Sequence, residues 1–313
     1  MEIKGMERPI RLRDFIIDRD GGIYAVSVYD NDKRAGCVLR YLPDPNGERT
    51  CAEGKRYRKI EFDEAFAWIL EHHPEWNDSV HRIPLDQIAS VLKPEEEMDR
   101  IMQLNPRVRS LISLFNLPEK SYGCTGSLLC GLENEASDID LVVYGEHWFS
   151  AQRQLADAVS AGKIPEMSDE MWRKVYRKRI PEIGFDDFVA HESRKFNRGE
   201  YEGTYFDLLF SRGYAEQNAV PIKKGIPIGR EVIEATVTDA SLAFDNPSVY
   251  AIDHEEISYV LSFTHTYAGQ ALPGEVIEAA GVIEDHGDAK WLIVGTTREA
   301  RGEYILSRTL LDR

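Results

Sequence analysis

The 313-residue chain lacks any uninterrupted apolar run approaching the ~20 residues that a membrane-spanning helix needs. Its first residues, MEIKGMERPIRLRDF, also lack the apolar core of a secretory signal. Hydrophobic residues make up 42% of the chain and charged residues 29%, which is an ordinary composition for a soluble protein. We therefore expect a soluble, cytoplasmic protein of two or three domains that does not associate with membranes.

Cysteine is scarce, and its spacing excludes two classes of site. The four cysteines form no C-x-x-C pair and have no histidine at a zinc-finger spacing. Four in 313 residues are also too few for a disulfide scaffold. We expect reduced, structural thiols at Cys37, Cys51, Cys124 and Cys130.

Basic residues are outnumbered, and the net charge is −16. The imbalance is largest in residues 216–313, which carry 8 basic and 16 acidic side chains. A long nucleic-acid footprint needs a basic face that releases counterions. Extended nucleic-acid binding is therefore not favoured.

No internal repeat or low-complexity tract is present, and the hydrophobic pattern changes twice along the chain. The first part predicts a β meander over 10–17, 23–29 and 37–42, a polar loop over 44–57 and an amphipathic helix over 62–72. Helical patterns follow at 84–92, 94–102 and 107–115, and Glu95–Glu97 fits the acidic first turn of the second one.

The later chain predicts helices at 147–161, 171–180 and 185–196 and a strand at 204–210. Short β-rich runs then recur, at 232–237, 248–252, 257–267, 275–283, 290–294 and 304–307. The predicted fold class is α+β, with an N-terminal α+β domain (1–105), a central domain with a mixed sheet and flanking helices (106–215), and a C-terminal all-β sandwich or barrel (216–313).

The stretch from Gly123 to Gly145 carries the strongest chemical pattern. In SDIDLVV, Asp138 and Asp140 flank Ile139, so on a strand both carboxylates point to one side and the isoleucine to the other. Two adjacent carboxylates repel each other unless a cation lies between them, and Mg²⁺ takes such oxygen ligands together with substrate phosphates. Ten residues upstream, Gly126 and Ser127 fit a turn whose backbone approaches a phosphate closely.

This order of turn, spacer and Asp-x-Asp strand resembles the polymerase-β-like nucleotidyltransferase superfamily, over about residues 106–212. The whole plan also resembles archaeal predicted nucleotidyltransferases of unassigned substrate. The resemblance implies a third carboxylate on a later strand, and Asp207 in YFDLLF is the best match, with Asp186 or Asp187 in reserve. It implies that Asp138, Asp140 and Asp207 are catalytic and bind two Mg²⁺ ions, and that Gly126 and Ser127 bind the phosphates of an NTP, with ATP as the first choice.

One position departs from the family pattern. Cys130 stands where many small members have arginine, so one positive charge near the phosphates is missing. A basic cluster between the second and third carboxylates could replace it, and Lys195 and Arg198 are our candidates for nucleotide binding. The alternative is a solvated surface whose cations are balanced by nearby acidic residues. The cluster consists of Arg173, Lys174, Arg177, Lys178, Arg179, Arg194, Lys195 and Arg198.

The resemblance implies an enzyme that moves a nucleoside monophosphate from an NTP to an acceptor hydroxyl and releases pyrophosphate. The acceptor stays open between RNA, protein and a small molecule. The alternative is a non-catalytic nucleotide-sensing or interaction protein that keeps the fold for binding; the retained third carboxylate favours the enzyme. For the aspartates, the competing interpretation is a simple Asp-rich turn capped by Ser137 and Asp138.

Overall fold

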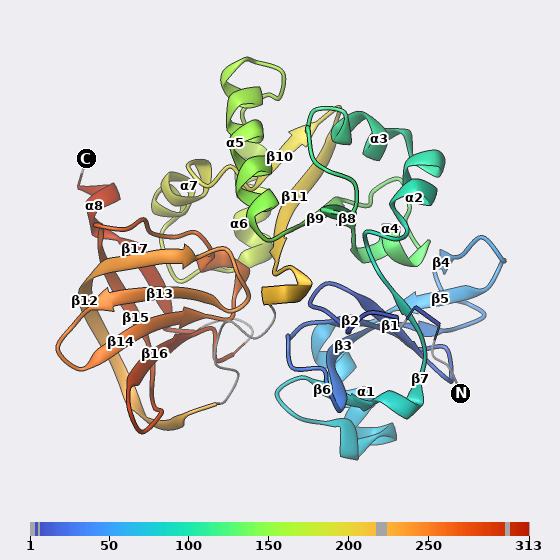
Figure 1. Cartoon of the computed structure of the whole chain (residues 1–313), viewed down its shortest axis with the longest axis horizontal. Coiled ribbons are helices and arrows are strands. Elements are labelled where there is room, and N and C mark those ends of the chain that lie inside the picture. The colour runs from blue at the N-terminus through green and yellow to red at the C-terminus, as the bar shows by residue number, and fades with distance from the viewer. Residues whose placement is uncertain (1–3, 6, 217–223, 298–300, 313) are drawn as a thin grey trace. The chain divides into compact units, whose positions relative to one another are not determined.

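The structure is a computed structural model that describes residues 4–5, 7–216, 224–297 and 301–312 (Figure 1). It contains helices and three sheets, which confirms the α+β class. The chain divides into two compact units, one with Met1–Ile164 and Glu200–Ile222 and one with Pro165–Gly199 and Lys223–Arg313. This division does not follow the boundaries at residues 105 and 215, and the three-domain layout stays a prediction. Within the described residues, no helix has the length and apolar character needed to cross a membrane.

The N-terminal part of the first unit is an antiparallel sheet. Its strands run in the order β4-β5-β3-β2-β1-β7, and β6 pairs with β3. Helix α1 (Phe62–His72) occurs where its periodicity predicts it and buries Ala65 and Ile69 in the core of this sheet. The strands are β1 (Phe15–Asp18), β2 (Ile23–Val26), β3 (Arg34–Pro43), β4 (Arg49–Thr50), β5 (Arg56–Lys59), β6 (His81–Pro84) and β7 (Ile88–Leu92), with short 3-10 helices η1 (Pro74–Trp76) and η2 (Leu85–Gln87).

Two predictions for this part are wrong. The helix predicted over 84–92 is instead η2 followed by β7, because the apolar run there pairs with β1 as an edge strand. A short apolar run fits either structure, and the tertiary pairing decides between them. The loop over 44–57 likewise contains β4 and the start of β5, which form a hairpin.

The central part of the first unit is a four-stranded mixed sheet in the order β10-β11-β9-β8, although Arg198 and Gly199 at the start of β10 belong to the second unit. Strand β8 is antiparallel to β9, and β11 is parallel to it, as the predicted mixed sheet requires. The elements are α2 (Met98–Leu104), α3 (Pro106–Ile112), β8 (Tyr122–Cys124), α4 (Gly126–Cys130), β9 (Ile139–Tyr144), α5 (Glu146–Ser160), β10 (Arg198–Tyr201), β11 (Thr204–Ser211) and η3 (Tyr214–Glu216).

A buried ionic network joins the two sheets of the first unit. Glu95 is 5% exposed, lies 2.9 Å from the guanidinium of Arg11, and accepts hydrogen bonds of 2.8 Å from the hydroxyls of Tyr144 and Tyr214. The predicted role of Glu95 in the first turn of a helix is therefore wrong, since α2 begins only at Met98. The network gives a physical reason why the N-terminal sheet and the four-stranded mixed sheet belong to one compact unit.

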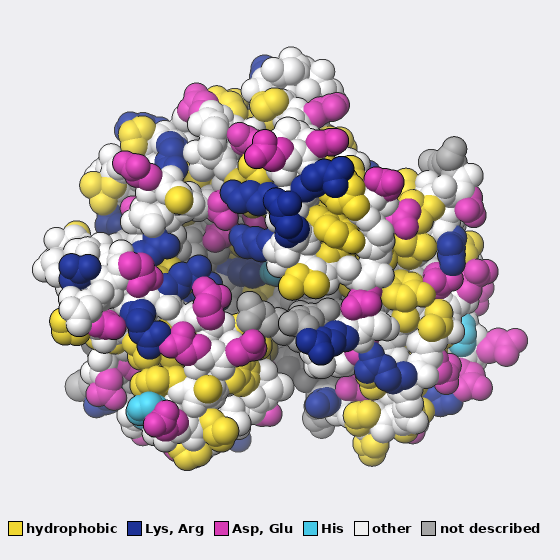
Figure 2. Space-filling model, turned by 180° about the vertical axis from the view of Figure 1, so that it is seen from behind, with side chains coloured by type: hydrophobic (Ala, Val, Ile, Leu, Met, Phe, Trp, Pro, Cys, Tyr) yellow, Lys and Arg dark blue, Asp and Glu magenta, His cyan; other side chains and the backbone are white. Residues whose placement is uncertain are grey.

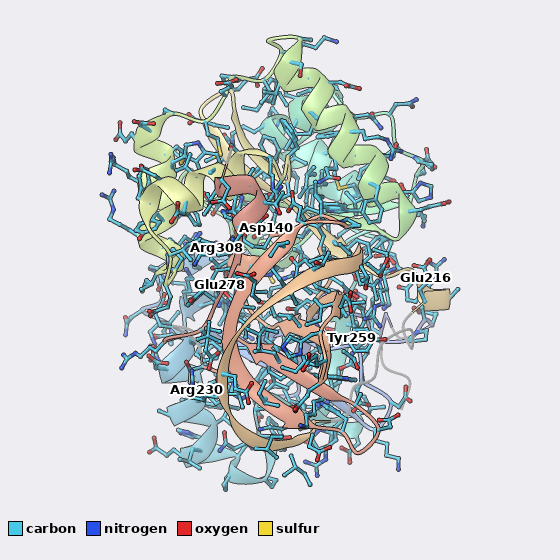
Figure 3. All side chains as sticks on the ribbon, turned by 90° about the vertical axis from the view of Figure 1, so that its left-hand side faces the viewer. Asp140, Glu216, Arg230, Tyr259, Glu278 and Arg308 are labelled. Atoms are coloured by element: carbon cyan, nitrogen blue, oxygen red, sulfur yellow. The ribbon has the colours of Figure 1, made fainter. Side chains whose placement is uncertain are left out.

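The described residues of the second unit combine the helices α6, α7 and α8 with a β barrel. Strands β12, β13, β14, β16 and β15 follow one another, and pairing between β12 and β15 closes the ring. All neighbours are antiparallel except β14 and β16, which are parallel. Arg308 and Glu278 form an ion pair at the junction of α8 and β15 (Figure 3). The elements are α6 (Asp169–Arg179), α7 (Phe185–Ser193), β12 (Ile226–Leu242), β13 (Ser248–Asp253), β14 (Ile257–Ser262), η4 (His265–Tyr267), β15 (Val276–Asp285), β16 (Lys290–Val294), β17 (Tyr304–Ser307) and α8 (Arg308–Leu311).

Candidate active site

Two of the predicted carboxylates lie on neighbouring strands. Strands β9 and β11 are parallel, and their register sets Asp140 directly opposite Asp207. Adjacent strands are about 4.8 Å apart and paired residues point to the same face, so these two side chains lie side by side. This register cannot be predicted from local sequence patterns, because 67 positions separate the two residues.

The remaining predicted carboxylate, Asp138, lies just before β9. Asp138 and Asp140 are both partly exposed, whereas Ile139 between them is 2% exposed. This is the alternation that the strand pattern predicts. The buried run Leu141–Val143 that follows anchors the strand in the core and fixes the direction of Asp140.

The predicted phosphate turn adjoins Asp140. A Cβ atom added to Gly126 would lie 2.6 Å from Oδ2 of Asp140, and Gly126 has a φ of +70°. Only glycine fits both conditions without strain. The backbone N–H of Thr125 also donates to the carbonyl of Asp140 at 2.9 Å, so the turn that begins α4 is tied to β9 at this point.

The N-terminal sheet and the loop before it pack against this turn. The Thr125 hydroxyl donates to the carbonyl of Arg13 at 2.7 Å. Leu129 and Leu132, in and after α4, are buried in a cluster with residues of that sheet, among them Phe15 and Tyr41. The position of Gly126 and Ser127 therefore depends on the packing of the N-terminal residues.

Tyr205 also lies at the site, although no sequence motif marks it. Its hydroxyl donates a hydrogen bond of 2.9 Å to Oδ1 of Asp207, which is 7% exposed. Tyr205 lies two residues before Asp207 on β11, so a period of two would have placed both on one face. A tyrosine in this position holds the carboxylate of Asp207 in one orientation.

Burial disfavours the thiolate form of the cysteines near the site. Burial, and then the charge of Asp140, raises the pKa of the Cys124 thiol. Burial likewise raises the pKa of Cys130. Protonated thiols react slowly, and all four cysteines are free, which agrees with the predicted structural role.

Lys195 and Arg198 lie in the second unit, in a buried network around Glu192. Lys195 is 1% exposed, forms an ion pair with Glu192 and donates to the carbonyl of Thr266 at 3.0 Å. Arg198 is 7% exposed and lies 3.0 Å from the same carboxylate. These contacts support the segment itself, and the nucleotide-binding role of the two cations stays a prediction.

The donor set at β9 and β11 suits Mg²⁺. In the parts of the chain that the structure describes, no group of three or more His, Cys, Asp or Glu side chains is arranged to hold a metal ion. Mg²⁺ needs only one or two protein carboxylates when substrate phosphates complete its shell. The carboxylates of Asp140 and Asp207, which occupy paired positions on β9 and β11, fit that requirement, and Asp138 lies nearby in the chain.

Comparison with known proteins agrees with this geometry. The family model described as "Nucleotidyltransferase domain" matches residues 101–187. The chain is also 36% identical over 335 aligned residues to the uncharacterized protein MJ1086 of Methanocaldococcus jannaschii, covering 95% of this chain and 98% of that protein.

The chain belongs to the polymerase-β-like nucleotidyltransferase superfamily.

The part of the chain that this domain model matches contains Gly126, Ser127, Asp138 and Asp140, whereas Asp207 lies beyond it. The assignment of Asp207 therefore rests on the β9–β11 register. The similarity to MJ1086 extends over nearly the whole chain, so both proteins share more than the matched domain. No solved structure matches the chain.

Proposed function

We propose that the protein is a Mg²⁺-dependent enzyme that transfers a nucleoside monophosphate from an NTP, with ATP the first donor to test, to an acceptor hydroxyl. The observation that carries the proposal is the register that sets Asp140 opposite Asp207 beside Gly126. Two carboxylates on paired positions of adjacent strands repel each other, and a divalent cation between them relieves this repulsion. Membership of the superfamily supports the same class of reaction.

In the proposed reaction, the acceptor hydroxyl oxygen forms a bond to the α-phosphorus of the NTP. The bond from that phosphorus to the oxygen leading to the β-phosphate breaks, and pyrophosphate leaves. The hydroxyl proton passes to a carboxylate, for which Asp207 is our candidate, oriented by Tyr205. Bound Mg²⁺ would neutralise charge on the phosphates and on the departing pyrophosphate.

The other residues have holding roles in this proposal. Asp138, Asp140 and Asp207 would hold the metal, and the backbone N–H groups at Gly126 and Ser127 would bind the β- and γ-phosphates. The nucleotide contacts of Lys195 and Arg198 remain predictions. RNA, protein and small molecules remain the acceptor classes to test.

Isothermal titration with each NTP, with and without Mg²⁺, tests the donor site. We expect Mg²⁺-dependent binding by the wild type and its loss in Asp138→Asn and Asp140→Asn. Asp157→Asn, an exposed carboxylate on α5, is the matched control and should bind as the wild type does. Equal binding by all four proteins would contradict the metal site.

Transfer itself needs a second measurement. Radiolabelled NTP incubated with the protein and fractionated cell extract should put label into one class of acceptor, with release of pyrophosphate. Nucleotide binding without pyrophosphate release from any fraction would instead support the non-catalytic alternative.

A further inference from the structure

Helix α6 presents a cluster of cations to solvent. Its Trp172 and Val175 are buried, whereas Arg173, Lys174 and Arg177 are exposed. We call these three residues the α6 basic surface. The space-filling view shows Lys and Arg side chains gathered in a group on the surface (Figure 2).

Within the described residues, no carboxylate forms an ion pair with this surface. Asp169 and Glu170 precede Arg173 and Lys174 by one helical turn but make no ion pair with them. The guanidinium of Arg173 instead lies 4.4 Å from the ring centroid of Phe185. The three cations therefore keep their charged groups available to an anion from solution.

The helix itself gives only a partial reason for the cluster. Cations in the last turn, such as Arg177, stabilise the negative end of the helix dipole. Arg173 and Lys174 precede that turn and gain little from it. Like charges one turn apart, as at Arg173 and Arg177, cost a few tenths of a kcal/mol. A bound anion would remove this repulsion.

The chemistry of the surface favours phosphate over a protein partner. Arginine forks bind phosphate through two hydrogen bonds, and lysine adds a compact charge. Protein interfaces contain aromatic anchors and few lysines. On α6 the hydroxyl of Tyr176 is already bonded to the carbonyl of Ile183 at 2.8 Å, so this tyrosine is not such an anchor.

The barrel in the same unit indicates which phosphate compound to expect. Its closed order β12-β13-β14-β16-β15, with β14 parallel to β16, is the connectivity of the OB fold. OB folds bind oligonucleotides and oligosaccharides, and of these only oligonucleotides carry phosphates. The acidic composition of residues 216–313 limits the phosphate contacts to a short footprint around α6.

We propose that the α6 basic surface binds the phosphate backbone of a single-stranded polynucleotide. The binding involves no metal and no transfer step, so it can be tested without reference to the proposed reaction. With three phosphate contacts, the affinity for a single strand should fall about 20-fold between about 50 and about 200 mM salt.

Fluorescence anisotropy with labelled oligo(U) and oligo(dT), on the full chain without NTP or Mg²⁺, measures this binding. The triple variant Arg173→Gln/Lys174→Gln/Arg177→Gln should bind at least about tenfold more weakly and lose most of the salt dependence. The control Lys33→Gln/Lys163→Gln/Lys224→Gln removes the same charge from exposed lysines elsewhere and should bind within about twofold of the wild type. Thermal melts of both variants establish that they are folded.

Oligo(U) and oligo(dT) distinguish RNA from DNA as the ligand, because the tighter-binding probe identifies the type of polynucleotide. Equal losses in both triple variants would overturn the proposal, because the effect would then be one of net charge. So would an absence of binding by the wild type, or displacement of oligo(U) by polyglutamate at equal charge, which would assign the surface to an acidic protein partner.

Discussion

Gly126 meets Asp140 at a distance that leaves no room for a methyl group. An added Cβ would lie 2.6 Å from Oδ2 of Asp140, at a φ of +70°. Gly126→Ala should therefore displace the Asp140 carboxylate and weaken Mg²⁺-dependent nucleotide binding by at least about tenfold, since about 1.4 kcal/mol suffices for that change. Isothermal titration checks this.

Gly162 supplies the matched control for that substitution. Its φ is +68°, close to that of Gly126, but no atom lies within 4 Å of an added Cβ. Gly162→Ala should cost the same left-handed strain of about 1–2 kcal/mol in stability and leave nucleotide binding unchanged. Equal nucleotide affinities in the two alanine variants would show that the contact with Asp140 is unimportant.

His81 is a second residue whose surroundings allow a definite expectation. It is fully buried against Phe66, and neither ring nitrogen has a hydrogen-bond partner within the described residues. Burial lowers the pKa of His81 to about 4. Because this folded-state pKa lies below the unfolded value of about 6.5, the neutral ring's contribution to stability is present above pH 6.5 and is lost as the pH falls toward 4.

His81→Phe should remove an unsatisfied polar group and raise the free energy of unfolding by about 1–3 kcal/mol at pH 7. The gain should increase between about pH 6.5 and about pH 4, where the wild-type histidine must take up a proton on unfolding. Urea titrations at several pH values measure both effects. A variant less stable than the wild type at pH 5 would contradict this account.

At the scale of elements, helix α7 is fixed to the barrel by its polar residues. His191 on α7 accepts a hydrogen bond of 2.9 Å from the backbone N–H of Ser307, and Lys195 just after the helix reaches Thr266. Removing one partner of a buried ion pair costs about 3–5 kcal/mol, so Lys195→Met should lower stability by that amount. Lys163→Met, at an exposed lysine, is the control.

The same variant decides the predicted nucleotide contact of Lys195. If the role of Lys195 is structural, folded Lys195→Met at low temperature should bind NTP as the wild type does. A reduced affinity together with an unchanged melting temperature would restore the nucleotide contact and contradict the structural role.

Element by element, local patterns were informative where one face of a helix or strand is buried. The helix Phe62–His72 and the strands Lys290–Val294 and Tyr304–Ser307 have the predicted bounds. The local pattern of the edge strand β7 predicts a helix. Its strand conformation depends on pairing with β1, whose residues lie 70 or more positions earlier in the chain. In the candidate site, the sequence spacing predicts that Gly126 and Asp140 belong to one site. The pairing of Asp140 with Asp207 and the contact of Tyr205 with Asp207 follow only from the folded structure.

At the scale of the whole molecule, the ion pair of Arg11 and Glu95 joins the N-terminal sheet to the sheet that carries the site. The Arg11 guanidinium also lies 3.5 Å from the ring centroid of Tyr144 on β9. Glu95→Gln would leave the buried Arg11 without its ion-pair partner and should destabilise the first unit by about 3–5 kcal/mol. Arg11→Met/Glu95→Met removes the buried charge but leaves the Tyr144 and Tyr214 hydroxyls without their acceptor, so it should recover part of that loss. Chemical denaturation of the three proteins measures it. A double variant no more stable than Glu95→Gln would contradict a specific charge effect.

The parallel pairing of β9 and β11 also has a consequence for synthesis on the ribosome. The N-terminal sheet, the phosphate turn and Asp140 emerge first, and residues 165–199, which belong to the second unit, emerge before β11 does. Domains tend to fold as they emerge, so the early part of the first unit must wait with one edge of β9 unpaired. A nascent chain that stops before residue 204 has its phosphate turn but only two of its three carboxylates, and the candidate site is completed only when translation has passed β11.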